Sequence, residues 1–316
     1  MLRDAREVAI ACPVNPDADA LGSSLGLAHH LVARGATVVV GYPNEPLEMP
    51  GWAAALPVDG LVVPVEAFPS SPAVMVTCDC AAFDRLGSLG AAADAAGELI
   101  WIDHHRSNDG RGTIRLVDPD ASSTCEVVAR LLDAIGGDIS DESAICLYAG
   151  LVTDTGRFQY EAATPETLRL AARLREHPFD HTRLSQVLYE NNQAAYLDVL
   201  GVAMDRAELD ADAGLVWTYV LWSDLENAGA EPGDVDDLID VLRATRDADT
   251  AALVKQQRDG RFKVSVRSRG ARDLSVVAAA FGGGGHRLAA GYTSEVGPAE
   301  TIRRLRAAVT AAASVP

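Results

Sequence analysis

The stretch VAIACPVNPDADALGSS, residues 8–24, decides the fold of the first half of this chain and marks its first candidate site. It opens with an apolar run, Val8–Cys12, that predicts a buried strand. It leads into Leu21–Ala33, whose alanine and leucine content predicts a helix. Asp17 and Asp19 lie in the turn between the two. A turn of this kind lies at the carboxyl edge of an open α/β sheet, where ligands bind.

The same alternation of apolar, β-branched runs with helical segments continues through the first half of the chain. Strands separated by helices predict an α/β fold with a mostly parallel sheet flanked by helices. From residue 141 to about residue 190 the pattern becomes largely helical. The expected strands are Val8–Cys12, Thr37–Gly41, Ala73–Cys78 and Leu99–Ile102, and the expected helices are Leu21–Ala33 and Arg85–Ala96.

A second strand-rich region begins near residue 207 and predicts a separate, smaller α/β domain. The pair Asp259-Gly260, between two strand-like runs, is a strong hairpin signal. We therefore expect a first domain over 1–190, a partly helical linker over 191–206 and a second domain over 207–316. The expected strands here are Gly214–Leu221, Thr250–Gln257 and Arg261–Ser268, and the expected helices are Val235–Thr245, Leu274–Phe281 and Pro298–Ala313.

Length and composition are those of a globular protein. The chain of 316 residues is long enough for two domains that each bury a core, with 48% hydrophobic and 23% charged residues. The run Val8–Cys12 is too short for a signal peptide core, and no apolar stretch approaches the ~20 residues that span a bilayer. We expect a cytoplasmic protein with no membrane partner. The five cysteines lack paired C-x-x-C spacing, so we interpret them as small buried hydrophobes.

The formal net charge of −18 limits the class of partner. Long duplex DNA is disfavoured, because binding of a nucleic acid backbone depends on clusters of Lys and Arg. A short anionic ligand remains compatible, since divalent cations and a few local Arg, His and N–H groups reverse the sign of the field inside a cleft. If the chain associates, a homodimer is the expected form, because it is the commonest soluble assembly.

Three further motifs carry carboxylates or imidazoles where a predicted strand or helix ends. They are Asp79, after the strand-like run Ala73–Cys78, then Asp103-His104-His105, and then Asp154 within Thr153-Asp154-Thr155-Gly156. Taken singly, Asp79 and Asp154 are better explained as cap or turn residues, and the His pair is explained equally well as solvated surface side chains. Their shared position favours a site for a divalent metal, whose usual ligands are carboxylates and imidazoles.

The glycine-rich motif FGGGGHRLAAG, residues 281–291, is the main candidate for a binding site in the second domain. Glycine lets the backbone approach an anion closely and offer several N–H groups, with His286 and Arg287 as charged partners. A flexible linker is the alternative explanation of four glycines. It is disfavoured because the run lies between an apolar helical segment and a predicted strand.

The motifs NPDAD at residues 15–19, DHH at 103–105 and TDTG at 153–156, in this order, resemble those of the DHH phosphoesterases. Within that family the chain is most similar to the bacterial group of oligoribonucleases and phosphoadenosine-phosphate phosphatases, whose actinobacterial members also hydrolyse cyclic di-AMP. The resemblance covers almost the whole chain, including the glycine-rich motif. It implies a catalytic first domain and a substrate-binding second domain.

The resemblance also implies roles for individual residues. Two manganese ions are expected in the first domain, bridged by Asp79. His105 is expected to face the phosphate, and Asp103 to orient His104. The first ion is expected on Asp19, Asp79, His104 and Asp154, and the second on Asp17, Asp79 and a histidine two positions before Asn15. The expected substrate-binding residues are Asn15, Arg267, Gly283, Gly284, Gly285 and His286, although a solvated surface arginine is an equal alternative for Arg267.

The chain departs from the family pattern at the position of that histidine, which is Pro13. Its side chain has no ligand atom, so the second ion is left with two carboxylates and whatever Asn15, water or substrate adds. Cys12 is adjacent, but strand alternation should turn its side chain to the opposite face. The second ion is therefore expected to bind weakly, only with substrate, or not at all.

These observations predict a metal-dependent phosphoesterase that hydrolyses small nucleotide substrates by water attack at a di-manganese site. Short oligoribonucleotides, phosphoadenosine phosphate and cyclic di-AMP are the substrates that the resemblance implies. The alternative is a nucleotide-binding module whose catalysis is weakened by Pro13. An inorganic pyrophosphatase would share the first motifs, but the glycine-rich motif disfavours it.

Overall fold

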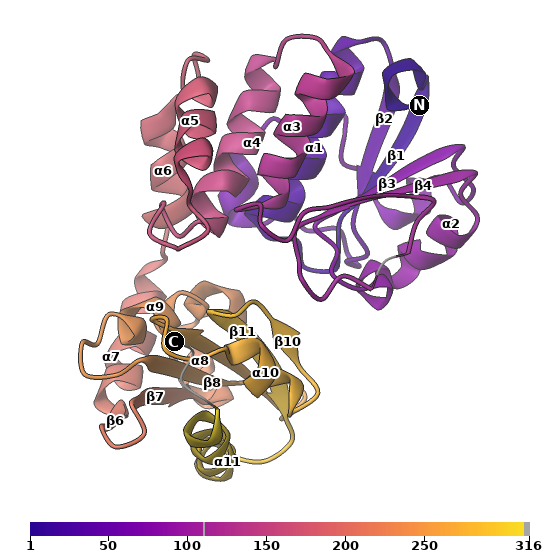
Figure 1. Ribbon diagram of the computed structural model, residues 1–316. Coiled ribbons are helices and arrows are strands. Elements are labelled where there is room, and N and C mark those ends of the chain that lie inside the picture. The colour runs from indigo at the N-terminus through magenta and orange to yellow at the C-terminus, as the bar shows by residue number, and fades with distance from the viewer. Residues whose placement is uncertain (110, 313–316) are drawn as a thin grey trace. The chain divides into compact units, whose positions relative to one another are not determined.

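The computed structural model describes residues 1–109 and 111–312. The chain divides into two compact units, Met1–Asn191 and Asn192–Pro316. Each unit has its own sheet and its own buried apolar core (Figure 1). No helix among the described residues is long and apolar enough to cross a membrane.

The N-terminal unit is built on a five-stranded parallel sheet with strand order β2-β1-β3-β4-β5. Because every strand runs in the same direction, all the carboxyl ends lie at one edge. This confirms the expected α/β fold and each of the four expected strands. The strands are β1 (Glu7–Ala11), β2 (Thr37–Gly41), β3 (Val74–Cys78), β4 (Glu98–Asp103) and β5 (Ile114–Val117).

Helices cover both faces of this sheet. Helices α1, α3 and α4 lie side by side over one core cluster, and the short α2 lies over a second cluster that contains Trp101 and Met75 (Figure 1). A Cβ built at Gly150 of α4 would lie 2.8 Å from Cα of Asp19, so glycine lets α4 approach the first turn of α1. The helices are α1 (Ala18–Ala33), α2 (Gly90–Asp94), α3 (Thr124–Ile135), α4 (Asp141–Asp154), α5 (Pro165–Leu174) and α6 (His181–Tyr189), with 3₁₀ turns at Leu2–Asp4, Gly51–Ala55, Val65–Ala67 and Phe83–Leu89.

Two sequence-based expectations for this unit were incomplete. The single helix expected over Arg85–Ala96 is a 3₁₀ turn followed by the short α2, because Gly87, at φ 49°, breaks the helical path. Strand β5 and helix α3 were not predicted. Helix α3 has a recognisable start, since the side chain of its N-cap Ser123 accepts the N–H of Glu126.

The C-terminal unit contains a mixed six-stranded sheet with order β10-β11-β9-β8-β7-β6, in which only the pair β7 and β8 is parallel. Strands β8 and β9 form the hairpin predicted from Asp259-Gly260, with Gly260 at φ 86°. The strands are β6 (Glu208–Asp210), β7 (Leu215–Val220), β8 (Thr250–Gln256), β9 (Phe262–Ser268), β10 (Gly284–Gly285) and β11 (Ala289–Ser294).

Helices lie on both faces of this sheet as well. One core cluster joins the sheet to α10 and α11, and another joins it to α7, α8 and α9. The segment 191–206, expected as a linker, contains α7, whose Tyr196, Val199 and Ala203 belong to the second of these clusters. The helices are α7 (Ala194–Asp205), α8 (Trp222–Ala228), α9 (Leu238–Arg243), α10 (Leu274–Ala279) and α11 (Pro298–Ala311), with a 3₁₀ turn at Pro232–Val235. Residue 313, the expected end of the last helix, lies outside the described residues.

All five cysteines are buried and unbridged, as predicted from their positions in apolar runs. Cys12 points toward α1, where its Sγ lies 3.1 Å from Oγ of Ser24 and 3.5 Å from the carbonyl oxygen of Ala20.

Candidate functional site

The acidic and imidazole motifs meet at the carboxyl edge of the N-terminal sheet. Asp79 directly follows β3, and Asp103 is the last residue of β4 with His104 next to it. Asp19 lies in the first turn of α1, which follows β1. Strands β1, β3 and β4 are neighbours, so their carboxyl ends bring these side chains together.

Asp19 is buried at 1% exposure, yet both of its carboxylate oxygens accept hydrogen bonds. The N–H of Thr124 donates to Oδ2 at 2.6 Å, and the N–H of Cys125 donates to Oδ1 at 2.9 Å. These are the first two N–H groups of α3, which have no partner within the helix. The positive end of the helix dipole therefore stabilises the Asp19 carboxylate and fixes its orientation.

His104 presents one ring nitrogen to three carboxylates. Its Nε2 lies 3.3 Å from Oδ2 of Asp154, 3.6 Å from Oδ1 of Asp79 and 3.8 Å from Oδ2 of Asp19. The other nitrogen, Nδ1, lies 3.3 Å from the carbonyl oxygen of Ala121. A carbonyl only accepts, so Nδ1 carries the proton in this contact and the neutral ring keeps a lone pair on Nε2.

Asp79 adopts a left-handed backbone conformation, with φ 56°. Such a conformation is unfavourable in most non-glycine residues and is concentrated at functional sites. The hydroxyl of Thr124 donates to Oδ1 of Asp79 at 2.8 Å. Burial and the nearby charge of Asp19 raise the pKa of Asp79 from 3.8 to about 8. The side chain is therefore held in an environment that disfavours its charge unless a cation is present.

Asp154, the last residue of α4, completes the group of three carboxylates around His104. Burial and the charges of Asp19 and Asp79 raise its pKa well above the ordinary value. A carboxylate at the C-terminal end of a helix is also disfavoured by the helix dipole. Three acidic groups thus converge where a positive ion would relieve the repulsion among them.

The family resemblance implied that Asp103 orients His104. The backbone N–H of His104 donates to Oδ1 of Asp103 at 2.8 Å, but the imidazole that Asp103 contacts is that of His105. Oδ1 of Asp103 lies 2.7 Å from Nδ1 of His105, and Oδ2 accepts from the side-chain amide of Asn108 at 2.6 Å. Burial raises the pKa of Asp103, but these hydrogen bonds and the charge of His105 hold it below its ordinary value. For His105 burial acts in the other direction and lowers the pKa, but Asp103 and Asp79 raise it to about 9. The carbonyl of Ala121 therefore contacts the ring of His104, and Asp103 contacts the ring of His105.

This set of side chains could hold a metal ion. Asp19, Asp79 and His104 each offer one ligand atom, and these atoms lie within 4.8 Å of one another. Asp79, Asp103 and His105 form an overlapping group by the same measure. Carboxylate oxygens with an imidazole nitrogen suit a hard or borderline divalent cation, and the protein contacts to His104 and Asp19 are those that orient metal ligands.

The structure gives Asp17 a different contact. Its Oδ1 accepts the N–H groups of Asp19 and Ala20 at 3.0 and 2.9 Å, so it is the N-cap of α1. Its charge still contributes to the raised pKa of Asp79. Pro13 is buried just beyond β1.

Asn15 is paired with a residue that the sequence did not single out. Its N–H donates to Oδ1 of Asn44 at 2.8 Å, and the Asn44 side-chain amide donates to Oδ1 of Asn15 at 2.5 Å. This reciprocal pair holds Asn15 at φ 51° beside the sheet edge. Thr124, Asn44 and Asn108 were all missed in the sequence. Thr124 alone had a signal, as the residue after a helix N-cap.

Most of the expected substrate-binding residues lie in the C-terminal unit. Arg267 is on β9 opposite Ala289 of β11, and its Nη1 donates to the Val266 carbonyl at 3.1 Å. The glycine run is not an open loop, because Gly284 and Gly285 form β10 and pair with β11. A Cβ built at Gly283 would lie 2.2 Å from the carbonyl oxygen of Gly291, so part of the motif serves close packing of backbone. His286 follows directly, and its N–H donates to the Ala289 carbonyl at 2.8 Å.

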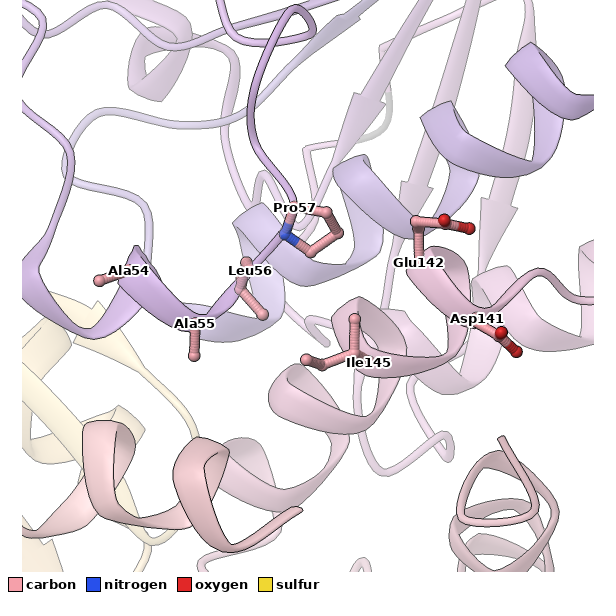
Figure 2. Close-up of a pocket in the computed structure, with 7 residues that line it drawn as sticks. All are labelled: Ala54, Ala55, Leu56, Pro57, Asp141, Glu142 and Ile145. Carbon is pink, nitrogen blue, oxygen red and sulfur yellow. The ribbon is translucent and has the colours of Figure 1, made fainter. Parts of the chain in front are cut away.

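A hollow of about 340 Å³ on the N-terminal unit lies away from this chemistry. Ala54, Leu56 and Pro57 line one side, and Asp141, Glu142 and Ile145 of α4 line the other (Figure 2). Asp141 and Asp154 are opposite ends of a 14-residue helix, which is ~20 Å long. The hollow is therefore not part of the acidic and imidazole site.

Both units match described protein families. Residues 7–151 match the DHH family, N-terminal domain, and residues 214–314 match the DHHA1 domain. The chain is 33% identical over 285 residues to the bifunctional oligoribonuclease and PAP phosphatase NrnA of Thermus thermophilus, covering 90% of this chain and 83% of the relative. It is 28% identical to the NrnA of Bacillus subtilis, covering 88% and 86%.

A similar solved structure is the crystal structure of an exopolyphosphatase-related protein from Bacteroides fragilis. The TM-score is 0.89 at 25% identity, covering 98% of this chain and 93% of that chain. The order of motifs, the parallel sheet with its acidic and imidazole edge, and the sequence matches agree with one another. The chain belongs to the DHH phosphoesterase family, with a DHH N-terminal domain followed by a DHHA1 domain.

Proposed function

We propose that this protein hydrolyses phosphoester bonds in short nucleotide substrates, with divalent manganese held by Asp19, Asp79, His104 and Asp154. The observation that carries the proposal is the position of His104, whose Nε2 faces three carboxylates while its Nδ1 is held by a carbonyl. Short oligoribonucleotides and phosphoadenosine phosphate are the proposed substrates because the relatives are named for them. Cyclic di-AMP is a third candidate, implied by the family resemblance.

The protein's own residues would prepare the site for the reaction. The N–H groups of α3 and the hydroxyl of Thr124 orient Asp19 and Asp79 before any ligand arrives. Divalent ions held there supply activation of water and neutralisation of phosphate charge. The Nδ1 of His105 is held by Asp103, and the raised pKa of His105, about 9, favours proton donation to a leaving oxygen.

We propose that residues of the C-terminal unit bind the substrate. Arg267 and His286 supply cationic or donor groups, and Gly283, Gly284 and Gly285 keep side chains away from the backbone N–H groups beside them. With a net charge of −18, the chain suits a short substrate better than a long duplex.

Turnover of a substrate panel tests the proposal. Ribonucleotides of two to five residues, phosphoadenosine phosphate and cyclic di-AMP are incubated with manganese, with magnesium and with chelator. We expect hydrolysis of at least one substrate with manganese and none with chelator. Asp79→Asn should abolish turnover, whereas Asp84→Asn, at an exposed position five residues further on, should not change it. Full activity of Asp79→Asn, or activity in chelator, would refute the metal assignment.

A second assay tests the assignment of His286 to substrate binding. His286→Ala should raise KM while kcat stays near the wild-type value, which is the signature of lost uniform binding. A steep fall of kcat at constant KM would place His286 in the chemistry instead. Tight binding of every substrate without turnover of any would favour the alternative, a nucleotide-binding module weakened at Pro13.

A further inference from the structure

A strained turn directly follows Asp154. Gly156, Arg157 and Phe158 have φ values of 56°, 60° and 64°, three successive residues in the left-handed region. Among the described residues, four non-glycine residues have positive φ. Two of these, Asn15 and Asp79, lie at the candidate site, and the other two are Arg157 and Phe158 in this turn. Strain of this kind persists only where the surrounding structure enforces it, and it is concentrated at functional sites.

Hydrogen bonds hold this turn against the end of α4. The N–H of Arg157 donates to the carbonyl of Val152 at 2.8 Å, and the N–H of Phe158 donates to Oγ1 of Thr155 at 3.1 Å. The Thr155 hydroxyl, fully buried, donates in turn to the carbonyl of Leu151 at 2.7 Å. The backbone of Arg157 is therefore fixed relative to Asp154.

The Arg157 side chain is supported by an aromatic ring. Its guanidinium carbon lies 3.9 Å from the centre of the ring of Tyr189, the last residue of α6. Arg157 is exposed, and within the described parts of the chain no acidic side chain lies within 4 Å of it. A guanidinium that lies over an aromatic ring still offers N–H donors, and its planar fork matches a phosphate.

We propose that Arg157 binds a phosphate of the substrate next to the one that is hydrolysed, with Tyr189 as its support. This inference rests on the proposed function. Arg157 lies three positions after Asp154, so their Cα atoms are at most ~11 Å apart. The guanidinium has no carboxylate of the site within ion-pair distance, so it is not part of the acidic cluster itself. Substrates with two or more phosphates would therefore be favoured over those with one.

The test compares Arg157→Gln with the wild type on a nucleoside 3′,5′-bisphosphate and on the matching 3′-monophosphate. For the bisphosphate we expect KM to rise about 10- to 100-fold with kcat nearly unchanged, the loss of one charge-assisted contact. For the monophosphate neither constant should change. Tyr189→Leu should give a smaller loss in the same direction.

Two further variants separate binding from structure. Arg157→Gly suits the left-handed backbone, so it should unfold at the same or a higher temperature than the wild type and still lose affinity for the bisphosphate. Arg175→Gln is the matched control, because Arg175 also lies over an aromatic ring, 5.2 Å from that of Phe179, but outside the strained turn. It should leave both substrates unaffected.

Three results would overturn the inference: an unchanged KM for the bisphosphate in Arg157→Gln, an equal loss on both substrates, or an equal loss in Arg175→Gln. If the wild type hydrolyses neither substrate, the proposed function fails. Equilibrium binding of the bisphosphate to the wild type and to Arg157→Gln then decides on Arg157 separately, with equal affinity counting against it.

Discussion

Replacing Asp79 by asparagine should make the protein more stable in the presence of chelator, although it should abolish turnover. The carboxyl group is buried beside Asp19, and burial and that charge raise its pKa from 3.8 to about 8. Asparagine keeps an oxygen that accepts the hydroxyl hydrogen of Thr124, and it tolerates the left-handed backbone at φ 56°. The substitution thus removes the disfavoured charge and little else.

The magnitude follows from proton linkage. A carboxyl group whose pKa is raised on folding costs nothing below pH 3.8, and its cost grows until the pH reaches about 8. At pH 7 the interval above 3.8 corresponds to a free energy of about 4 kcal/mol, and at pH 5 to one of about 1 to 2 kcal/mol. The free energy of unfolding of the asparagine variant should exceed that of the wild type by up to these amounts.

The assay is urea unfolding of both proteins in chelator at pH 5 and pH 7, followed by the same measurement with manganese. Manganese should stabilise the wild type more than the variant, because only the wild type keeps the ligand. Asp103→Asn is a control for which we expect the opposite change in the free energy of unfolding. The pKa of Asp103 is lowered by hydrogen bonds from His105 and Asn108 despite its burial, so asparagine should destabilise there.

The reasoning fails if Asp79→Asn is no more stable than the wild type at pH 7 in chelator. It also fails if the difference between the two proteins does not shrink at pH 5. Either outcome would mean that the acidic groups of the site do not repel one another in the folded protein.

Three other predictions test separate parts of the structure. Thr124→Val should lower kcat/KM about 10-fold by removing a hydrogen bond to Asp79, and Thr124→Ser should restore it. Gly283→Ala should destabilise the protein by about 2 kcal/mol in urea unfolding, because its Cβ would lie 2.2 Å from a carbonyl oxygen of β11, whereas Gly284→Ala meets nothing within 4 Å and should be neutral. Pro13→His should bind a second manganese more tightly and turn over faster at low manganese, and identical calorimetric titrations of the two proteins would contradict this.

The order of elements was readable from the sequence because it depends on local patterns. Apolar, β-branched runs predicted four parallel strands, and all four are present. Placing Asp79 and Asp103-His104 at strand ends was enough to bring them to one edge, because parallel strands share their carboxyl ends. The hairpin at Asp259-Gly260 was predicted in the same way, from turn chemistry alone.

The partners of each side chain were decided only by the tertiary structure. Asp19 accepts N–H groups from residues 105 and 106 positions further along the chain, a contact created by packing of α1 against α3. Asp103 was expected to orient His104. It accepts the backbone N–H of His104, but the ring that it contacts is that of His105, because that choice depends on side-chain torsions and on the position of the Ala121 carbonyl. Local sequence patterns therefore placed the reactive groups at one edge, and long-range packing determined which atoms face each other there.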